Sequence, residues 1–220
     1  MPSLRHMAAC SGIEGDFSVV HDLSGLRAGI PRGQQISLAR HGELLERNSF
    51  DVDLIRVGLE DLQGVDDRID RANLRARELY ATVDIGIRRF FHSQITRADA
   101  DGLDTIFSKK DSRKLRRRWR GPHEHALDVF AVRQYQVDAT DLGGICTINS
   151  NRTCNKNLRA ADGCVVGFTG PSPFGGELLA HEIGHGLGLE HVTNTDNVMH
   201  RSSSQREGFA ESQARTMRDH

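Results

Sequence analysis

Apolar residues recur along most of the chain at two spacings, one typical of strands and one typical of helices. Alternation of apolar and polar residues predicts strands over 51–59 and 84–95, and a denser apolar run predicts a central strand over 126–135. Two shorter apolar runs, 143–149 and 163–168, predict strands on either side of a polar loop. The pattern therefore predicts five strands, spread over most of the chain.

Helical spacing occurs in three places. From Asp66 to Val83, apolar side chains return every three or four residues, which predicts a long amphipathic helix. A second helix is predicted from Gly176 to Gly188, because Gly188 can adopt the left-handed conformation that ends a helix. A third is predicted from about residue 207 to the C-terminus.

The first fifty residues differ from the rest, because they are interrupted by glycines and only weakly periodic. We interpret 1–50 as an N-terminal extension and 51–220 as one domain of ordinary size. Two interpretations of the extension remain open, an inert segment and an inhibitory pro-segment.

The overall composition excludes some classes of protein. The net charge is −1, so no global field favours a nucleic-acid partner or an acidic substrate. A hydrophobic content of 37% is low but sufficient for one core. No apolar run is long enough to span a membrane, and the N-terminus lacks the apolar stretch of a secretory signal. Nothing in the sequence indicates an oligomeric state.

The most informative stretch is HEIGHGLGLEH, from His181 to His191. On a helix, His181 and His185 project from one face about 6 Å apart along the axis, which suits two ligands of one Zn²⁺. Glu182 lies beside the first ligand, where a carboxylate can take a proton from the attacking water. A turn at Gly188 can bring His191 to the same metal. Three nitrogen ligands and one open position are typical of catalytic zinc, whereas a lone histidine on an apolar face is usually a core residue.

The full pattern H-E-x-x-H-x-x-G-x-x-H over 181–191 resembles the zinc signature of the metzincin metallopeptidases. Metzincins also have a methionine in a tight turn beneath the metal, and TNTDNVMH places Met199 eight residues after His191. The resemblance implies that Met199 forms an apolar floor under the zinc and is not a ligand. Some metzincins have a tyrosine ligand two residues further on; here that position is Arg201, so we expect three protein ligands and water.

The order of the predicted elements is also similar to that of a metzincin catalytic domain. The resemblance implies an α+β fold (α/β/α-like) with a twisted mixed sheet, a backing helix, a zinc-binding helix, a Met-turn and a C-terminal helix. The segment before the zinc helix looks most like the adamalysin branch. The resemblance implies a secreted or extracytoplasmic zinc endopeptidase with one catalytic ion. Because no secretory signal is visible, an intracellular location is the alternative. It also implies that 143–149 is an unpaired edge, to which a polypeptide substrate can add through main-chain hydrogen bonds.

A basic stretch over 109–120, KKDSRKLRRRWR, supports an alternative function. Eight of its twelve residues are basic, so it could bind nucleic acid or another partner, with Trp119 stacking and the zinc kept for structure. A solvated helix or loop face is the simpler interpretation, because the rest of the chain balances this charge. Glu182 and the open fourth position favour the peptidase.

Two further features allow alternative interpretations. Cys146, Cys154 and Cys164 lie close together before the zinc helix, and they can either hold one disulfide within the cluster or remain free thiols. The sequence IEGD ends at Asp16 and resembles the F-x-G-D segment through which astacin pro-segments place an aspartate on the zinc. This resemblance makes Asp16 a candidate latency switch.

Overall fold

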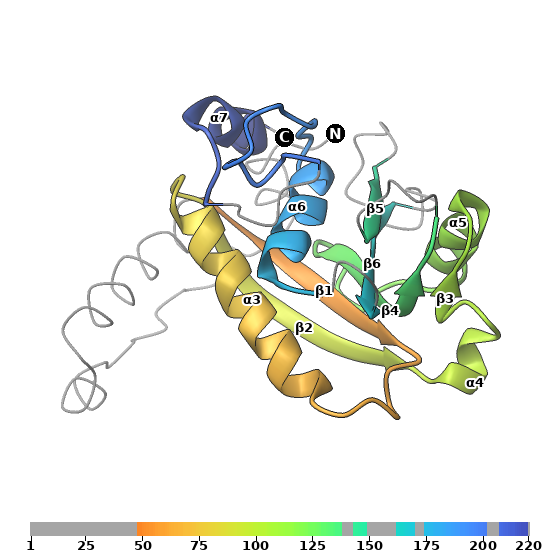
Figure 1. The fold of residues 1–220 in the computed structure, drawn as a ribbon. Helices are drawn as coiled ribbons and strands as arrows, with labels where there is room; N and C mark the ends of the chain where they lie inside the picture. Colours follow the sequence, from red (N-terminus) through yellow and green to blue (C-terminus); the bar gives the residue numbers. More distant parts are fainter. Residues whose placement is uncertain (1–47, 138–142, 149–161, 170–173, 202–206, 220) are drawn as a thin grey trace, which may run out of the picture.

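A computed structural model shows the arrangement of the chain from residue 48 onward (Figure 1). The residues it describes are 48–137, 143–148, 162–169, 174–201 and 207–219. Cys10, Asp16 and Cys154 lie outside these ranges, so the candidate latency switch is not placed relative to the rest of the chain.

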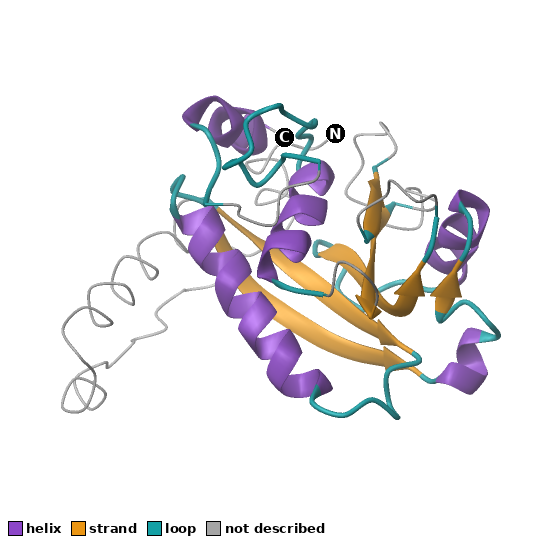
Figure 2. Ribbon diagram, viewed as in Figure 1, coloured by secondary structure: helices purple, strands orange, loops and turns teal. Residues whose placement is uncertain are grey.

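A mixed six-stranded sheet forms the centre of the fold, with helices on both of its faces (Figures 1 and 2). The strands are β1 (Ser49–Val57), β2 (Gly86–Ile95), β3 (Thr105–Ile106), β4 (Leu127–Tyr135), β5 (Gly144–Thr147) and β6 (Gly163–Thr169). Their order is β2-β1-β4-β6-β5, with β3 paired to β4. The strands run parallel except β5, which is antiparallel to β6. The short antiparallel strand β5 therefore ends the sheet in the described part of the chain.

The helices divide between the two faces of the sheet. They are α3 (Val65–Ala81), α4 (Arg97–Ala100), α5 (Lys109–Arg118), α6 (Gly176–Gly186) and α7 (Glu211–Asp219). Side chains of β1 alternate between the faces: Leu54 joins the core cluster that includes α3 and α6, whereas Ile55 joins the cluster that includes Leu115 of α5. Burial on both faces explains why β4 is apolar at consecutive positions from Val129 to Val132.

Helix α6 is fixed over the sheet by contacts with α3. The buried Tyr80 hydroxyl donates a hydrogen bond of 2.9 Å to the carbonyl of Ala180, and burial raises the pKa of that phenol, so it stays a neutral donor. Arg75 pairs with Glu177 at 2.8 Å. Gly176 lets the two helices approach, because a Cβ atom there would meet the Arg75 side chain. These contacts hold the first turns of α6 rigidly.

The structure confirms the predicted α+β fold and each of the five predicted strands. The helix expected over 66–83 is α3, and the basic stretch forms α5. Boundaries differ by a few residues: β1 begins at Ser49, and the last helix begins at Glu211 instead of residue 207. Such shifts are ordinary, because terminal turns lack part of their hydrogen bonding. Of the helices in the described ranges, none is both long and apolar enough to cross a membrane.

Candidate metal centre

Three imidazoles converge at the C-terminal end of α6. His181 and His185 lie one turn apart on the helix, and the chain then turns at Gly188, whose φ of 84° lies in the left-handed region. This turn brings His191 back to the helix. The three Nε2 atoms lie 3.2 Å from one another, and among the described residues this is the one group of three or more side chains that could hold a metal ion.

The hydrogen bonds made by the Nδ1 atoms of His181 and His185 determine whether their Nε2 atoms can bind a metal. His181 Nδ1 lies 2.7 Å from the carbonyl of Val198, and His185 Nδ1 lies 2.8 Å from that of Leu189. A carbonyl only accepts, so each Nδ1 carries the hydrogen and each Nε2 presents a lone pair. Two lone pairs at 3.2 Å repel each other unless a cation or a shared proton lies between them. Tetrahedral zinc holds neighbouring nitrogen ligands about 3.3 Å apart, so the group fits this ion.

Arg201 lies beside the third imidazole, His191. Its Nδ1 lies 3.4 Å from a guanidinium nitrogen of Arg201, a long contact at the exposed side of the ring. A guanidinium has no lone pair for a metal, so Arg201 lies close to the group without joining it. The protein ligands available to an ion here are therefore the three imidazoles.

Met199 packs beneath α6, fully buried. A Cβ atom at Gly184 would come within 2.5 Å of the Met199 sulfur, so the glycine lets the methionine approach the helix backbone. The Met199 amide donates to Asn197 Oδ1 at 2.8 Å, and the Asn197 side chain exchanges two hydrogen bonds with Gln213 of α7. This link between the turn and the last helix is not visible in the sequence, because nothing local marks Gln213 as a partner.

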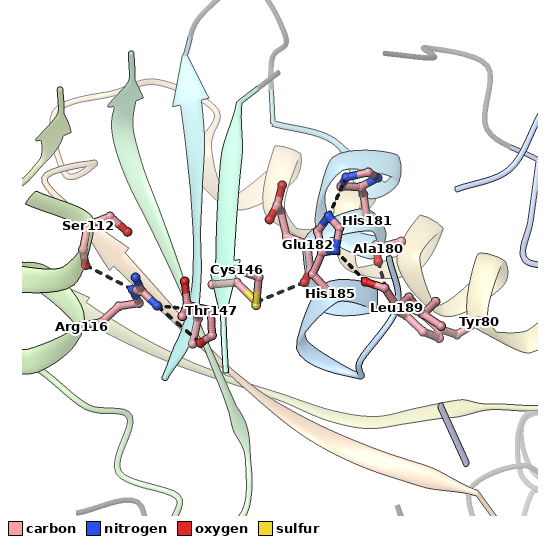
Figure 3. Close-up of a disulfide and its surroundings, with 12 residues drawn as sticks. Tyr80, Ser112, Arg116, Cys146, Thr147, Ala180, His181, Glu182, His185 and Leu189 are labelled. Carbon is pink, nitrogen blue, oxygen red and sulfur yellow. Dashed lines mark hydrogen bonds between the residues drawn. A yellow bond between two sulfur atoms is a disulfide. The ribbon is translucent and has the colours of Figure 1, made fainter. Parts of the chain in front are cut away.

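The Glu182 side chain is buried between α6 and β5 (Figure 3). A Cβ atom on Gly144 would lie 2.7 Å from the Glu182 carboxylate, so the strand passes directly against it. Only glycine allows this approach without displacement. The sequence motif predicts Glu182 beside the metal, but no local signal marks Gly144, which lies 38 residues before Glu182 in the chain.

A disulfide joins β5 to β6 behind this glycine. Cys146 and Cys164 lie directly opposite each other in the antiparallel register and are bonded. The Cys164 sulfur lies 3.2 Å from the main-chain oxygen of Glu182. Of the two alternatives left open by the sequence, the bridge within the cluster is therefore confirmed, and it fixes the edge strand against α6.

Arg116 holds the other end of β5 from the opposite face of the sheet. Its side chain is 3% exposed and donates to the carbonyls of Thr147 at 3.4 Å and Gly163 at 3.2 Å (Figure 3). Burial lowers the pKa of this guanidinium to about 10, which still leaves it charged at neutral pH. In the sequence, Arg116 is one of eight similar cations in the stretch 109–120. The signal that distinguishes it is the buried stripe Ser112, Leu115 and Arg116, at i, i+3 and i+4.

Comparisons with known proteins support the fold. No model of a known protein family matches the sequence, and no curated protein matches it. Among solved structures, metalloproteinase-II from Bacteroides fragilis is similar, with a TM-score of 0.54 and 14% sequence identity; the match covers 81% of this chain and 60% of that chain. Archaemetzincin from Methanopyrus kandleri gives a TM-score of 0.46 and 15% identity, over 76% of this chain and 93% of that chain. The chain therefore has a metallopeptidase-like fold with a three-histidine group.

Proposed function

We propose that this chain is a zinc-dependent endopeptidase of the metzincin type, with His181, His185 and His191 as the ligands of one catalytic ion. The observation that carries the proposal is the convergence of three Nε2 atoms at 3.2 Å, next to a buried carboxylate. The fold of the Bacteroides metalloproteinase supports it. The adamalysin branch and a floor role for Met199 remain predictions.

The residues of the site have separate roles in peptide hydrolysis. When bound, a zinc ion lowers the pKa of a coordinated water towards 7 and polarises the scissile carbonyl. Glu182 takes the proton of the attacking water and then passes it to the leaving amine. The carbonyls of Val198 and Leu189 keep His181 and His185 in the tautomer that presents Nε2. Proton transfer is therefore assigned to Glu182, and metal binding to His181 and His185 on the same helix and to His191 beyond its end.

The edge strand supplies a means of holding a polypeptide. An extended segment that pairs with β5 gains main-chain hydrogen bonds with little dependence on sequence. Gly144 on this strand touches the Glu182 carboxylate, so a segment paired there passes beside the proton acceptor. The arrangement favours cleavage within a chain over removal of terminal residues.

Digestion of an unstructured protein such as casein tests this proposal. The zinc-loaded chain should release fragments whose new termini lie at internal positions, as identified by mass spectrometry. Release of single terminal residues would indicate an exopeptidase. Intact casein after incubation with a zinc-containing Asp16→Ala chain, which lacks the proposed restraint, would reject the peptidase.

Replacing Gly144 with alanine should lower the rate of peptide cleavage without loss of zinc. The added methyl group would lie 2.7 Å from the Glu182 carboxylate, so either the strand or the carboxylate must move. A displacement of this kind costs about 10²-fold in rate when it misplaces a reacting group. Steady-state kinetics on a quenched peptide measure the effect, with Gly208→Ala as control because a Cβ atom there would meet only the Thr82 side chain, at 3.1 Å or more. A Gly144→Ala protein as fast as the unmodified chain would refute the contact's role.

We also propose that residues 1–50 restrain the enzyme through Asp16. A carboxylate at the open position of the metal would displace the attacking water. In the full chain, Asp16→Ala should raise the initial rate on a quenched peptide, whereas Asp22→Ala should not. Equal rates for all three proteins would leave the segment as an inert extension.

Export to an oxidising compartment is part of the same proposal. The cross-strand bridge between Cys146 and Cys164 supports it, because structural disulfides persist in such compartments and are rare in a reducing cytosol.

A further inference from the structure

Helix α5 presents a strongly cationic face to solvent. The cationic face consists of the six exposed side chains Lys109, Lys110, Arg113, Lys114, Arg117 and Arg118. Lys114 and Arg118 have long or exposed ion pairs with Asp111 and Asp101. The other four form no ion pair with any residue in the described ranges. Such a surface attracts a negatively charged partner.

The position of α5 connects this face to the proposed peptide-binding strand. Arg116, on the inner side of the helix, donates to the carbonyl of Thr147 at the end of β5. Thr147 lies three residues beyond Gly144, which corresponds to about 10 Å along a strand. Arg113 and Arg117 lie on the same helix as Arg116, three residues before it and one after it, so the cationic face begins close to this end of β5. Figure 3 shows the Arg116 side chain reaching Thr147.

A polypeptide that adds to β5 would present alternate side chains to the two faces of the sheet. Helix α6 covers one face and α5 the other, as their separate core clusters show. Side chains on the second face, and the segment that continues past Thr147, would therefore lie near α5. Acidic side chains in that segment would meet cations that lack ion pairs in the described structure.

Two other anionic partners fit the face less well. Single-stranded nucleic acid is held by aromatic side chains that stack on bases, but Trp119 is half-buried and covered by the Arg118 guanidinium at 4.4 Å. A membrane-bound helix inserts its apolar side into lipid, but Leu115 of α5 is fully buried in the core. The single exposed aromatic nearby is Phe107, just before the helix.

We propose that the cationic face of α5 binds acidic segments of the polypeptide substrate, so that the enzyme prefers cleavage sites flanked by clusters of Asp or Glu. This inference rests on the proposed peptidase function. It assigns a class of substrate, polypeptides with acidic segments. Exposed charge pairs mainly raise the association rate and the selectivity for such partners. The preference should therefore weaken as salt rises.

A pair of quenched peptides tests the proposal. Both have the same cleavable centre, flanked on both sides by five Glu residues in one peptide and by five Gln residues in the other. The zinc-loaded full chain should cleave the Glu peptide with a kcat/KM about tenfold higher at low salt, mainly through KM, and the advantage should fall below about twofold at 0.5 M salt. Neutralising Lys110, Arg113 and Arg117 to Gln should abolish the preference while the Gln peptide is cleaved as before.

A matched control variant separates this face from the overall charge of the molecule. Arg71→Gln, Arg89→Gln and Arg215→Gln remove the same charge from exposed positions on α3, β2 and α7. This control should keep the preference for the Glu peptide. Equal cleavage of both peptides by the unmodified chain would overturn the proposal, as would an unchanged preference in the α5 variant or its loss in the control.

Direct binding keeps the proposal testable when cleavage fails. If the zinc-loaded Asp16→Ala protein, which lacks the proposed restraint, cleaves neither peptide, the proposed function is wrong. Fluorescence anisotropy of the labelled Glu peptide then tests binding to the cationic face by itself. Binding that is lost in the α5 variant and kept in the control supports the acidic-segment site; absence of binding rejects it. Competition with a single-stranded oligonucleotide or with phosphatidylserine vesicles tests the other partners. If either displaces the labelled Glu peptide at a lower concentration than unlabelled Glu peptide needs, the proposal is rejected in favour of that partner.

Discussion

Replacing Glu182 with glutamine is expected to leave the zinc content unchanged and to reduce peptide cleavage by about 10²–10⁴-fold. Glutamine preserves the size of the side chain between α6 and β5 but cannot accept the proton of the attacking water. Initial rates on a quenched peptide, with zinc measured in the same samples, give the result.

Glu177→Gln is a suitable control for this experiment. Glu177 lies on the same helix but pairs with Arg75 of α3, so its loss should affect stability slightly and the rate little. If Glu182→Gln cleaved at the unmodified rate, the assignment of Glu182 as the proton acceptor would be wrong.

Replacing His185 with alanine is expected to abolish both zinc binding and cleavage. Only two imidazoles would remain, and the carbonyl of Leu189 would lose the ring that it orients. Elemental analysis after dialysis should find about one zinc per unmodified chain and a background amount in the variant. Because the ligands must be neutral, the unmodified protein should also lose zinc as the pH falls well below about 6.5, where free imidazoles become protonated.

His92→Ala controls for the loss of a histidine as such. His92 is exposed on β2, away from α6, and its replacement should leave zinc content and cleavage intact. Full zinc retention in His185→Ala would contradict the ligand assignment.

Most of the fold could be predicted from the sequence, because the patterns that mark helices and strands are local. The period-two alternation of β1 arises because alternate side chains of a strand face the same side of the sheet. The helical spacing of α3 arises because one face of the helix packs on that sheet. The convergence of the histidines was also predictable, since His181 and His185 share a helix face and Gly188 allows the turn to His191. Boundaries were predicted less accurately, and β3 and α4 were missed because such short elements show no period.

The contacts that surround the site were not predictable, because they join residues far apart in the sequence. Gly144 touches Glu182, Cys146 pairs with Cys164 rather than with Cys154, and Arg116 reaches the end of β5. Each depends on strand register and on the packing of elements across the sheet. No local pattern determines these, although the buried stripe on α5 distinguishes Arg116 from the neighbouring cations.

Titration of the metal-free chain with zinc tests the central claim most directly. Cleavage of a quenched peptide is followed while zinc is added to protein that has been stripped with a chelator. The rate should rise in proportion to bound zinc and level off at one ion per chain. A rate that is independent of zinc, or an Asp16→Ala chain that binds one zinc and cleaves neither peptide nor casein, would contradict the account.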